Sequence, residues 1–311
     1  MAGGWSGATL TSSSLKQAAL TGSAALWSGV GRVAGRLAGW KPALWHSPGG
    51  QRVLVVAPHP DDEVGCGGAV LLHGRAGDAV HVAYVTDGRA SRAGGLAPDE
   101  MADRRRQEVA DVAPVLGLAG AHWMGLREWE WDEAALVPVL RDLVQQTGPD
   151  IVYAPTCIDF HPEHVRVARC LARAIAPGSG TPAIRAYQLH VPLTPLLVNL
   201  VAPMEAVARE LIAAMQCYRT QLGSIERCLR MKRYAGSFYG LAGHAEEFWQ
   251  MDPAAYARIH ASPPGTPPDP AFRGVRPRPL TDPLAYLRGR GARRRLLRLT
   301  RERGGQARAA T

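Results

Sequence analysis

The stretch that decides the fold is V-V-A-P-H-P-D-D-E-V at residues 55–64, where a β-branched run ends at one imidazole and three carboxylates. Val and Ile runs favour buried strands, and Pro with Asp favours a turn leading into a helix. In open α/β sheets, ligands bind outside the carboxyl ends of the strands. The placement of His59, Asp61 and Asp62 directly after this strand therefore predicts the beginning of a metal site.

The same strand-then-helix pattern repeats along the chain. Hydrophobic periodicity and Gly or Pro stops predict alternating elements. The expected strands are residues 53–56, 80–86, a short one near His122, 151–154 and 184–191, and the expected helices are residues 65–74, 99–116, 134–146 and 163–175. Repeated units of this length predict an α/β fold, a Rossmann-like three-layer sandwich with a mainly parallel sheet.

The flanking regions differ in composition from this core. Residues 204–248 are expected to be mostly helical, and eight prolines within residues 262–283 predict an extended segment. From Ala271 onward twelve Arg face only Asp282 and Glu302, so residues 1–270 sum to −1 although the chain carries +9. We therefore expect an N-terminal segment at residues 1–49, a catalytic domain at 50–260, and a Pro-rich then Arg-rich tail at 261–311.

The N-terminal segment is rich in Gly, Ser and Ala, and its apolar residues fall at alternating steps of four and three. They are Leu26, Val30, Val33, Leu37, Trp40 and Leu44, with Arg32, Arg36 and Lys41 elsewhere on the helix. This amphipathic pattern predicts a helix docked on its own domain or on a partner, and the alternative is a helix lying on a membrane surface. An anionic membrane could also contact the Arg-rich tail.

Cysteine usage and hydropathy bear on the compartment. The five cysteines are scattered, odd in number and never spaced as C-x-x-C, which argues against a disulfide framework and a thiolate zinc site. No 18-residue stretch is apolar enough for a convincing membrane span, and the N-terminus lacks a compact signal-peptide core. We expect a cytoplasmic protein, with peripheral membrane contact as an open alternative.

A second polar cluster, D-F-H-P-E-H at residues 159–164, again follows a predicted strand and begins a helix. His59 and Asp62 supply two ligands, and His164 would complete a set of three with positions left for water and substrate, as in catalytic zinc sites. Asp61 would then act as general base on water activated by the metal. His161 would stabilise the oxyanion, and Glu163 or Asp159 would orient an imidazole.

Each cluster also has an ordinary structural explanation. Pro, Asp and Glu after a strand can simply cap a helix, and a His161-x-x-His164 pair can be a surface feature. Two such clusters at two strand ends favour the metal site. Ser91 and Cys66 lie near them but in no nucleophile pattern, so we expect Cys66 to pack beneath the Gly-rich turn.

The paired motifs resemble those of the PIG-L/LmbE family of zinc-dependent N-deacetylases. The resemblance runs from about Gln51 to Phe248 and includes A-P-H-P-D-D-E at residues 57–63, H-P-E-H at 161–164, T-D-G at 86–88 and Y-R-T-Q at 218–221. It implies one Zn²⁺ per site, or another divalent metal, held by His59, Asp62 and His164. It also implies Asp61 as base and His161 as oxyanion stabiliser or general acid.

The resemblance further implies a small-molecule substrate, an N-acyl amino sugar or glycoside. Separately, the abundance of Ala, Arg and Gly suggests a GC-rich bacterial source. Arg105 matches a family position near the substrate, although an i,i+3 ion pair with Glu108 explains it equally well. Two departures stand out: Glu163 replaces the usual Asp, and G-L-R-E-W-E-W-D at residues 125–132 replaces a short Asp-Gly loop. Trp129 and Trp131 in this loop could form an aromatic wall of the pocket or belong to the core.

Three competing functions were weighed. The G-C-G-G run at residues 65–68 suggests a dinucleotide site, but it lacks G-x-G-x-x-G spacing and has carboxylates where a pyrophosphate would lie. The Arg-rich tail suggests a polyanion-binding module, yet it has no interleaved aromatics, and we expect no specific nucleic acid. A metal-binding protein without turnover is the third, and the filled catalytic positions argue against it.

Overall fold

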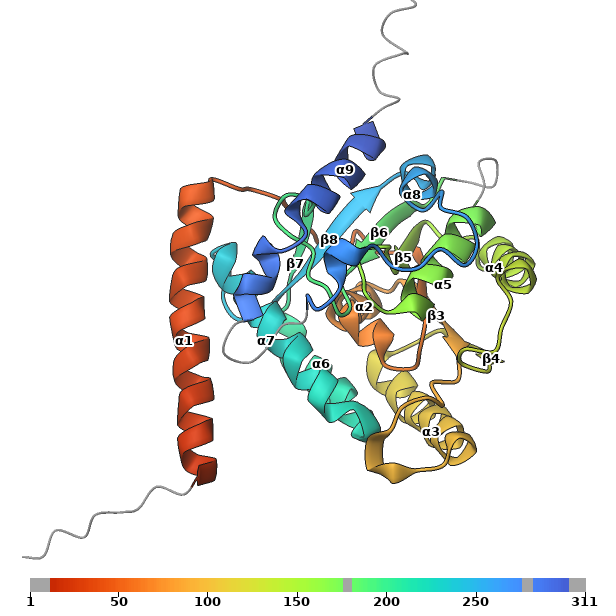
Figure 1. Cartoon of the computed structure of the whole chain (residues 1–311), viewed down its shortest axis with the longest axis horizontal. Coiled ribbons are helices and arrows are strands. Elements are labelled where there is room, and N and C mark those ends of the chain that lie inside the picture. Colours follow the sequence, from red (N-terminus) through yellow and green to blue (C-terminus); the bar gives the residue numbers. More distant parts are fainter. Residues whose placement is uncertain (1–11, 176–180, 276–281, 302–311) are drawn as a thin grey trace, which may run out of the picture.

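The computed structural model of the chain describes residues 12–175, 181–275 and 282–301. An eight-stranded sheet runs through the domain in the order β1-β7-β8-β6-β5-β2-β3-β4 (Figure 1). The strands are β1 Ala43–Leu44, β2 Arg52–Ala57, β3 Ala79–Thr86, β4 Gly120–Leu126, β5 Ile151–Ala154, β6 Ala183–Tyr187, β7 Leu200–Pro203 and β8 Ala245–Met251. All pairings are parallel except those of β8, which runs antiparallel to both neighbours.

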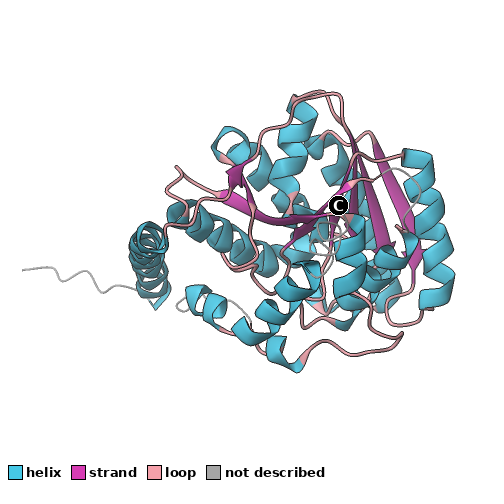
Figure 2. Cartoon of the chain, turned by 90° about the horizontal axis from the view of Figure 1, so that it is seen from above, coloured by secondary structure: helices cyan, strands magenta, loops and turns pink. Residues whose placement is uncertain are grey.

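Helices cover both faces of this sheet (Figure 2). The helices are α1 Ser12–Ala38, α2 Gly67–Arg75, α3 Pro98–Leu116, α4 Glu133–Thr147, α5 Pro162–Ala174, α6 Ala208–Cys217, α7 Leu222–Phe238, α8 Pro253–Ile259 and α9 Arg290–Arg301. The α/β three-layer sandwich with a mainly parallel sheet is therefore confirmed.

The side chains of β2 alternate between two hydrophobic core clusters, one on each face of the sheet. Val53 and Val55 point into one cluster, with residues of α2, α3 and α6, whereas Leu54 and Val56 point into another, with residues of α4, α5 and α8. Side chains of a strand alternate between faces, so a continuously apolar strand must be covered on both. This burial holds β2 in the middle of the sheet, where the loop after it reaches the site.

Three strands were not predicted. β1 is two residues long and β7 ends at Pro203, so neither shows a periodic pattern. β8 carries Glu246 and Glu247 in succession, both buried, which hydropathy cannot assign to a strand. The expected strand at 184–191 ends earlier, at Tyr187, and the chain then continues into the loop that carries His190.

The Arg-rich segment packs on the domain as far as the structure describes it. Helix α9 lies against α8, and the fully buried Arg293 donates to the carbonyl of Pro192 at 2.6 Å. Arg258 of α8 donates to the last carbonyls of α9, at Leu299 and Thr300. Residues 276–281 and 302–311 of the predicted tail lie outside the described residues, and the domain boundaries stay a prediction.

Candidate metal centre

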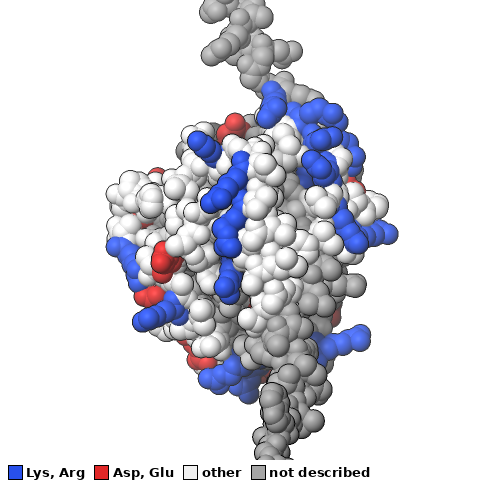
Figure 3. All heavy atoms as spheres, turned by 90° about the vertical axis from the view of Figure 1, so that its left-hand side faces the viewer, with Lys and Arg blue, Asp and Glu red and all other residues white. Residues whose placement is uncertain are grey.

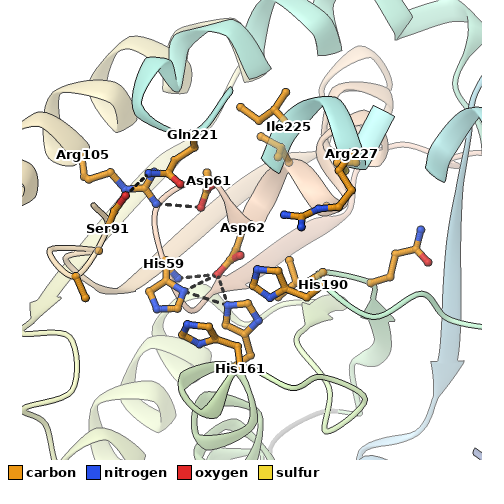
Figure 4. Close-up of a pocket in the computed structure, with 18 of the residues that line it drawn as sticks. His59, Asp61, Asp62, Ser91, Arg105, His161, His190, Gln221, Ile225 and Arg227 are labelled. Carbon is orange, nitrogen blue, oxygen red and sulfur yellow. Dashed lines mark hydrogen bonds and ion pairs between the residues drawn. The ribbon is translucent and has the colours of Figure 1, made fainter. Parts of the chain in front are cut away.

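Three donor atoms from the two motifs converge at the carboxyl ends of β2 and β5 (Figure 4). Nδ1 of His59 lies 3.1 Å from Oδ2 of Asp62 and 3.1 Å from Nε2 of His164, and the last two atoms are 3.3 Å apart. Donors bound at zinc's usual distances in a tetrahedral site are separated by about 3.3 Å. The arrangement of these three side chains therefore fits a small divalent cation.

Neighbouring strands bring the motifs together although 105 residues separate His59 from His164. β2 and β5 are paired in parallel, so the loops that follow them leave the sheet at the same edge. A 3₁₀ turn, Asp62–Gly65, follows β2, and α5 begins at Pro162 just after the loop from β5. Asp61 at the head of the turn has φ 93°, a left-handed conformation that is strained for a residue with a side chain.

Each imidazole donor has a carboxylate behind it. Oδ2 of Asp159 lies 2.9 Å from Nδ1 of His164, which fixes the tautomer with Nε2 free for a metal. Oε1 of Glu128 lies 3.3 Å from Nε2 of His59, close enough for charge interaction but without hydrogen-bond geometry. Asp159 also accepts from the backbone N–H of His161 at 2.8 Å, so it orders the whole second motif.

The electrostatics of the cluster favour a cation. Burial alone would lower the pKa of His59, but Asp62 and Glu128 outweigh it and raise that pKa to about 9. Burial likewise opposes the charge on His164, yet Asp62 and Asp159 raise its pKa well above the ordinary value. The carboxylates thus attract positive charge into a buried space, and a divalent ion satisfies that demand where protons would otherwise bind.

Alternative donor groupings are looser. His161 can replace Asp62 in a set with His59 and His164, and Asp159 and His190 can form a set with His164, with ligand atoms within 4.8 Å of one another. The ring of His190 stacks on that of His164 at a centroid distance of 4.8 Å. The tighter triangle containing Asp62 is the better site, because its atoms already lie at the spacing of a coordination sphere.

Asp61 points into the same cavity, beside the triangle (Figure 4). Nη2 of Arg105 donates to Oδ1 of Asp61 at 3.0 Å and also to the carbonyl of Pro60. Burial raises the pKa of Asp61 above its ordinary value, and Arg105 opposes that rise. The ion pair expected between Arg105 and Glu108 is present but longer, at 3.9 Å. Arg105 therefore contacts the predicted base as well as its helical neighbour.

Residues of the Y-R-T-Q motif at 218–221 form hydrogen bonds with the first motif and with residues near it. The hydroxyl of Tyr218 donates to Glu63 at 2.5 Å, and the other oxygen of Glu63 accepts from the backbone N–H of Asp61. Thr220 donates through its N–H and hydroxyl to Glu108 at 2.9 Å each. Gln221 donates to the hydroxyl of Ser91 at 2.8 Å on the cavity wall. Of these contacts, the bond from Tyr218 to Glu63 supports the strained turn at Asp61.

Glu163 does not hold an imidazole, contrary to one of the two sequence hypotheses. Its carboxylate accepts from the indole of Trp131 and from Arg166, which stacks on that indole at 3.8 Å. Glu163 leaves α5 on the side that faces the 125–132 loop, away from the triangle. Of the two, only Asp159 contacts an imidazole of the triangle.

The substituted loop at residues 125–132 contributes to the cavity in two ways. Its Glu128 contacts His59, and Trp129 lines the cavity with its ring 5.4 Å from that of His161. Trp129 is 49% exposed and has φ 72°, whereas Trp131 is 8% exposed and belongs to the core. The structure thus separates the two tryptophans. Sequence reasoning missed Glu128, although it directly follows β4 at the same edge of the sheet.

The cavity above the triangle holds about 340 Å³. Its far wall is formed by α7, which the sequence did not connect with the site. The lining residues from α7 are Ile225, Arg227, Cys228 and Met231, and Leu189 and Gln221 also line the cavity. Cys66, by contrast, is fully buried beneath the turn, as expected for a packing residue.

The suggested dinucleotide site is filled by the protein itself. Glu246 of β8 accepts from the backbone N–H groups of Gly68 and Ala69 at 3.0 and 2.8 Å, at the N-terminus of α2. Lys232 pairs with Glu246 and donates to the carbonyl of Gly65. A Cβ on Gly68 would lie 1.3 Å from Met204, so the glycine serves packing. A pyrophosphate has no room at this helix end.

Fold and site together define an α/β sandwich with a triangle of potential metal ligands at its strand ends. A family profile described as PIG-L, GlcNAc-PI de-N-acetylase, matches residues 54–175. The resemblance to this deacetylase family is therefore confirmed over that part of the chain, which contains both motifs.

A curated relative is the 2'-N-acetylparomamine deacetylase of Streptomyces fradiae, 30% identical over 152 residues. The match spans 41% of this chain and about half (53%) of that protein. Among solved structures, the N,N'-diacetylchitobiose deacetylase of Pyrococcus horikoshii matches with a TM-score of 0.59 at 22% identity, covering 66% of this chain and 85% of its own.

A third similar structure limits what the fold alone can say. GalB of Pseudomonas putida KT2440, a 4-carboxy-2-hydroxymuconate hydratase, matches with a TM-score of 0.54 at 23% identity, over 64% of this chain and 95% of its own. Likeness at this level of identity shows a shared fold. The reaction of the present protein must therefore be argued from its site.

Proposed function

We propose that the protein is a zinc-dependent hydrolase that removes an N-acyl group, above all N-acetyl, from an amino sugar or related glycoside. The observation that carries the proposal is the triangle of His59, Asp62 and His164 beside Asp61 in an open cavity. The deacetylase family profile over the same residues favours amide hydrolysis over the other chemistry known on this fold.

Zinc held by the triangle would lower the pKa of water towards neutrality and polarise the acyl carbonyl. In the proposed reaction, Asp61 accepts a proton from the attacking water and returns it to the departing amine. The raised pKa of Asp61 suits both steps, and Arg105 keeps its carboxylate pointed at the cavity. Water is the nucleophile in this reaction, so no side-chain nucleophile is required. The two side chains that could serve as one are not available, because Ser91 accepts a hydrogen bond from Gln221 and Cys66 is buried.

His161 is assigned to the oxyanion. Burial, followed by the neighbouring imidazoles of His164 and His59, lowers the pKa of His161 to about 2. A neutral imidazole can donate one hydrogen bond to the developing oxyanion but cannot supply a proton as an acid at neutral pH. Between the two roles that the family resemblance allowed, this favours oxyanion stabilisation.

The substrate class is inferred from the walls of the cavity. A volume of about 340 Å³ admits a sugar-sized group, and its lining mixes Trp129 with Arg105, Gln221 and the apolar Ile225 and Met231. An exposed aromatic ring beside polar groups suits the apolar face and hydroxyls of a sugar. The name of the Streptomyces fradiae relative gives 2'-N-acetylparomamine as its substrate, and we propose N-acetylated compounds of this kind as the first class to test.

The test is release of free amine from a panel of N-acetyl amino sugars and N-acetyl aminoglycosides. Turnover should appear with zinc, disappear with a chelator and return when zinc is restored. Asp61→Asn should retain zinc and lose about 10²–10⁴-fold in kcat, the usual contribution of a general base. Asp150→Asn provides a matched control, because Asp150 is half-exposed at the other end of β5 and pairs with Arg52.

Two results would contradict the proposal. Zinc-independent turnover would remove the metal from the mechanism, and full activity of Asp61→Asn would remove the base. Water addition to an unsaturated acid, with no amide of the panel cleaved, would favour hydratase chemistry instead.

A further inference from the structure

Four of the six residues in the apolar stripe predicted for the N-terminal segment do not face the domain. Leu26, Val30, Val33 and Leu37 are 64%, 41%, 58% and 83% exposed, and they form one line along α1. Together with the exposed Arg32 and Arg36 we call this surface the outer face of α1. Such a line of apolar side chains on one helix is unusual in water, because each would gain free energy by burial.

The docking of α1 is instead made by small residues. A Cβ at Gly35 would lie 1.8 Å from the carbonyl oxygen of Phe238, and one at Gly31 would lie 3.1 Å from the ring of Tyr234. Both partners are on α7, so the two helices touch at glycine. The indole of Trp40 donates to the carbonyl of Val198 at 3.2 Å just beyond the helix. These contacts fix the rotation of α1 and leave its outer face directed away from the protein.

The charge around this face is mainly positive. No Asp or Glu occurs before Asp61, and the basic residues in that part of the chain are Lys16, Arg32, Arg36, Lys41 and Arg52. On the same side of the molecule, an uncharged column runs between Lys and Arg side chains, with few acids nearby (Figure 3). Helix α9 adds exposed arginines at positions 290, 294, 295, 298 and 301.

We propose that the outer face of α1 binds the surface of an anionic lipid bilayer. An amphipathic helix lying in the interface buries its apolar line among acyl chains while Lys and Arg meet the headgroup charge. A second copy of the chain fits less well, since a symmetric contact would bring Arg32 and Arg36 of both copies together with no acid to neutralise them. Among the described residues no helix is long and apolar enough to cross a membrane, so the contact is peripheral.

The full chain should be mixed with vesicles of phosphatidylcholine alone and of phosphatidylcholine with phosphatidylglycerol, then separated by flotation. We expect binding to the anionic vesicles and little to the neutral ones, with loss of binding at high salt. Val33→Asp/Leu37→Asp should weaken binding at least about tenfold for each side chain withdrawn. Arg32→Ala/Arg36→Ala should weaken it about fivefold for each charge.

Val139→Asp is the matched control, because Val139 is 49% exposed on α4, far from α1 (Figure 1). The exposed variants should keep the melting temperature and the zinc content of the wild type. Absence of binding to anionic vesicles, or binding that Val33→Asp/Leu37→Asp leaves unchanged, overturns the proposal. So does a wild-type dimer, measured by light scattering, that the same variant converts to monomer without any vesicle binding. These outcomes are independent of whether the protein hydrolyses an N-acetyl sugar.

Discussion

Asp159→Asn offers the sharpest test of the metal centre. Asp159 is 2% exposed, and its carboxylate accepts from Nδ1–H of His164 at 2.9 Å while holding the N–H of His161. An asparagine keeps the shape but has only one acceptor oxygen for the two N–H donors that the carboxylate serves. When that oxygen stays with the N–H of His161, the amide NH₂ faces Nδ1 of His164 and cannot accept from it. The imidazole then gains by moving its proton to Nε2, the atom that faces Asp62 and His59. A protonated Nε2 cannot bind a metal.

The expected loss is about 10- to 100-fold in zinc affinity, as for other carboxylates behind a metal-binding histidine. This corresponds to about 1.4–2.7 kcal/mol. Zinc affinity would be measured by competition with a chromophoric chelator, with circular dichroism to confirm folding. Asp150→Asn, which changes an exposed Asp paired with Arg52, should bind zinc as the wild type does. Equal affinity of folded Asp159→Asn and wild type would refute the reasoning.

Three further predictions concern strain, proton linkage and a buried ion pair. In urea unfolding, Trp129→Gly should be about 1 kcal/mol more stable than Trp129→Ala, because only glycine adopts φ 72° without strain. Both substitutions should raise KM more than they lower kcat. Burial raises the pKa of Glu247 to about 7 despite its bonds from Tyr286 and Tyr239. The protonated Glu247 side chain therefore contributes to folding stability. This contribution is fully present below the ordinary carboxyl pKa and is lost as pH rises through about 7. The free energy of unfolding of Glu247→Gln, relative to that of the wild type, should therefore increase between pH 5 and 8, by at most about 3 kcal/mol. Glu133→Gln should cost about 3 kcal/mol or more, since it leaves the guanidinium of Arg169, 1% exposed, without its negatively charged partner, whereas Glu130→Gln in an exposed pair should cost under about 1 kcal/mol.

Much of the fold was predictable because local patterns and global packing agree. The continuous apolar runs of β2, β3 and β5 indicate strands covered on both faces, and the helices between them are bounded by Gly and Pro. The edge beyond β6 was not predictable. There β8 runs antiparallel and buries Glu246 and Glu247, whose partners include Lys232, 14 residues away, and Tyr286, 39 residues away. Pairing of that kind leaves no local signal.

The amino-acid sequence by itself determined which side chains could bind a metal and that both motifs follow strands, since those features depend on residue type and near neighbours. Only the tertiary structure decided how side chains are directed. It aims Asp159 at His164 and turns Glu163 to Trp131, and it brings Glu128 to His59. It also turns the apolar line of α1 outward, because glycines permit a closer approach to α7 than larger side chains would. Direction depends on contacts between distant segments, and a one-dimensional pattern does not contain them.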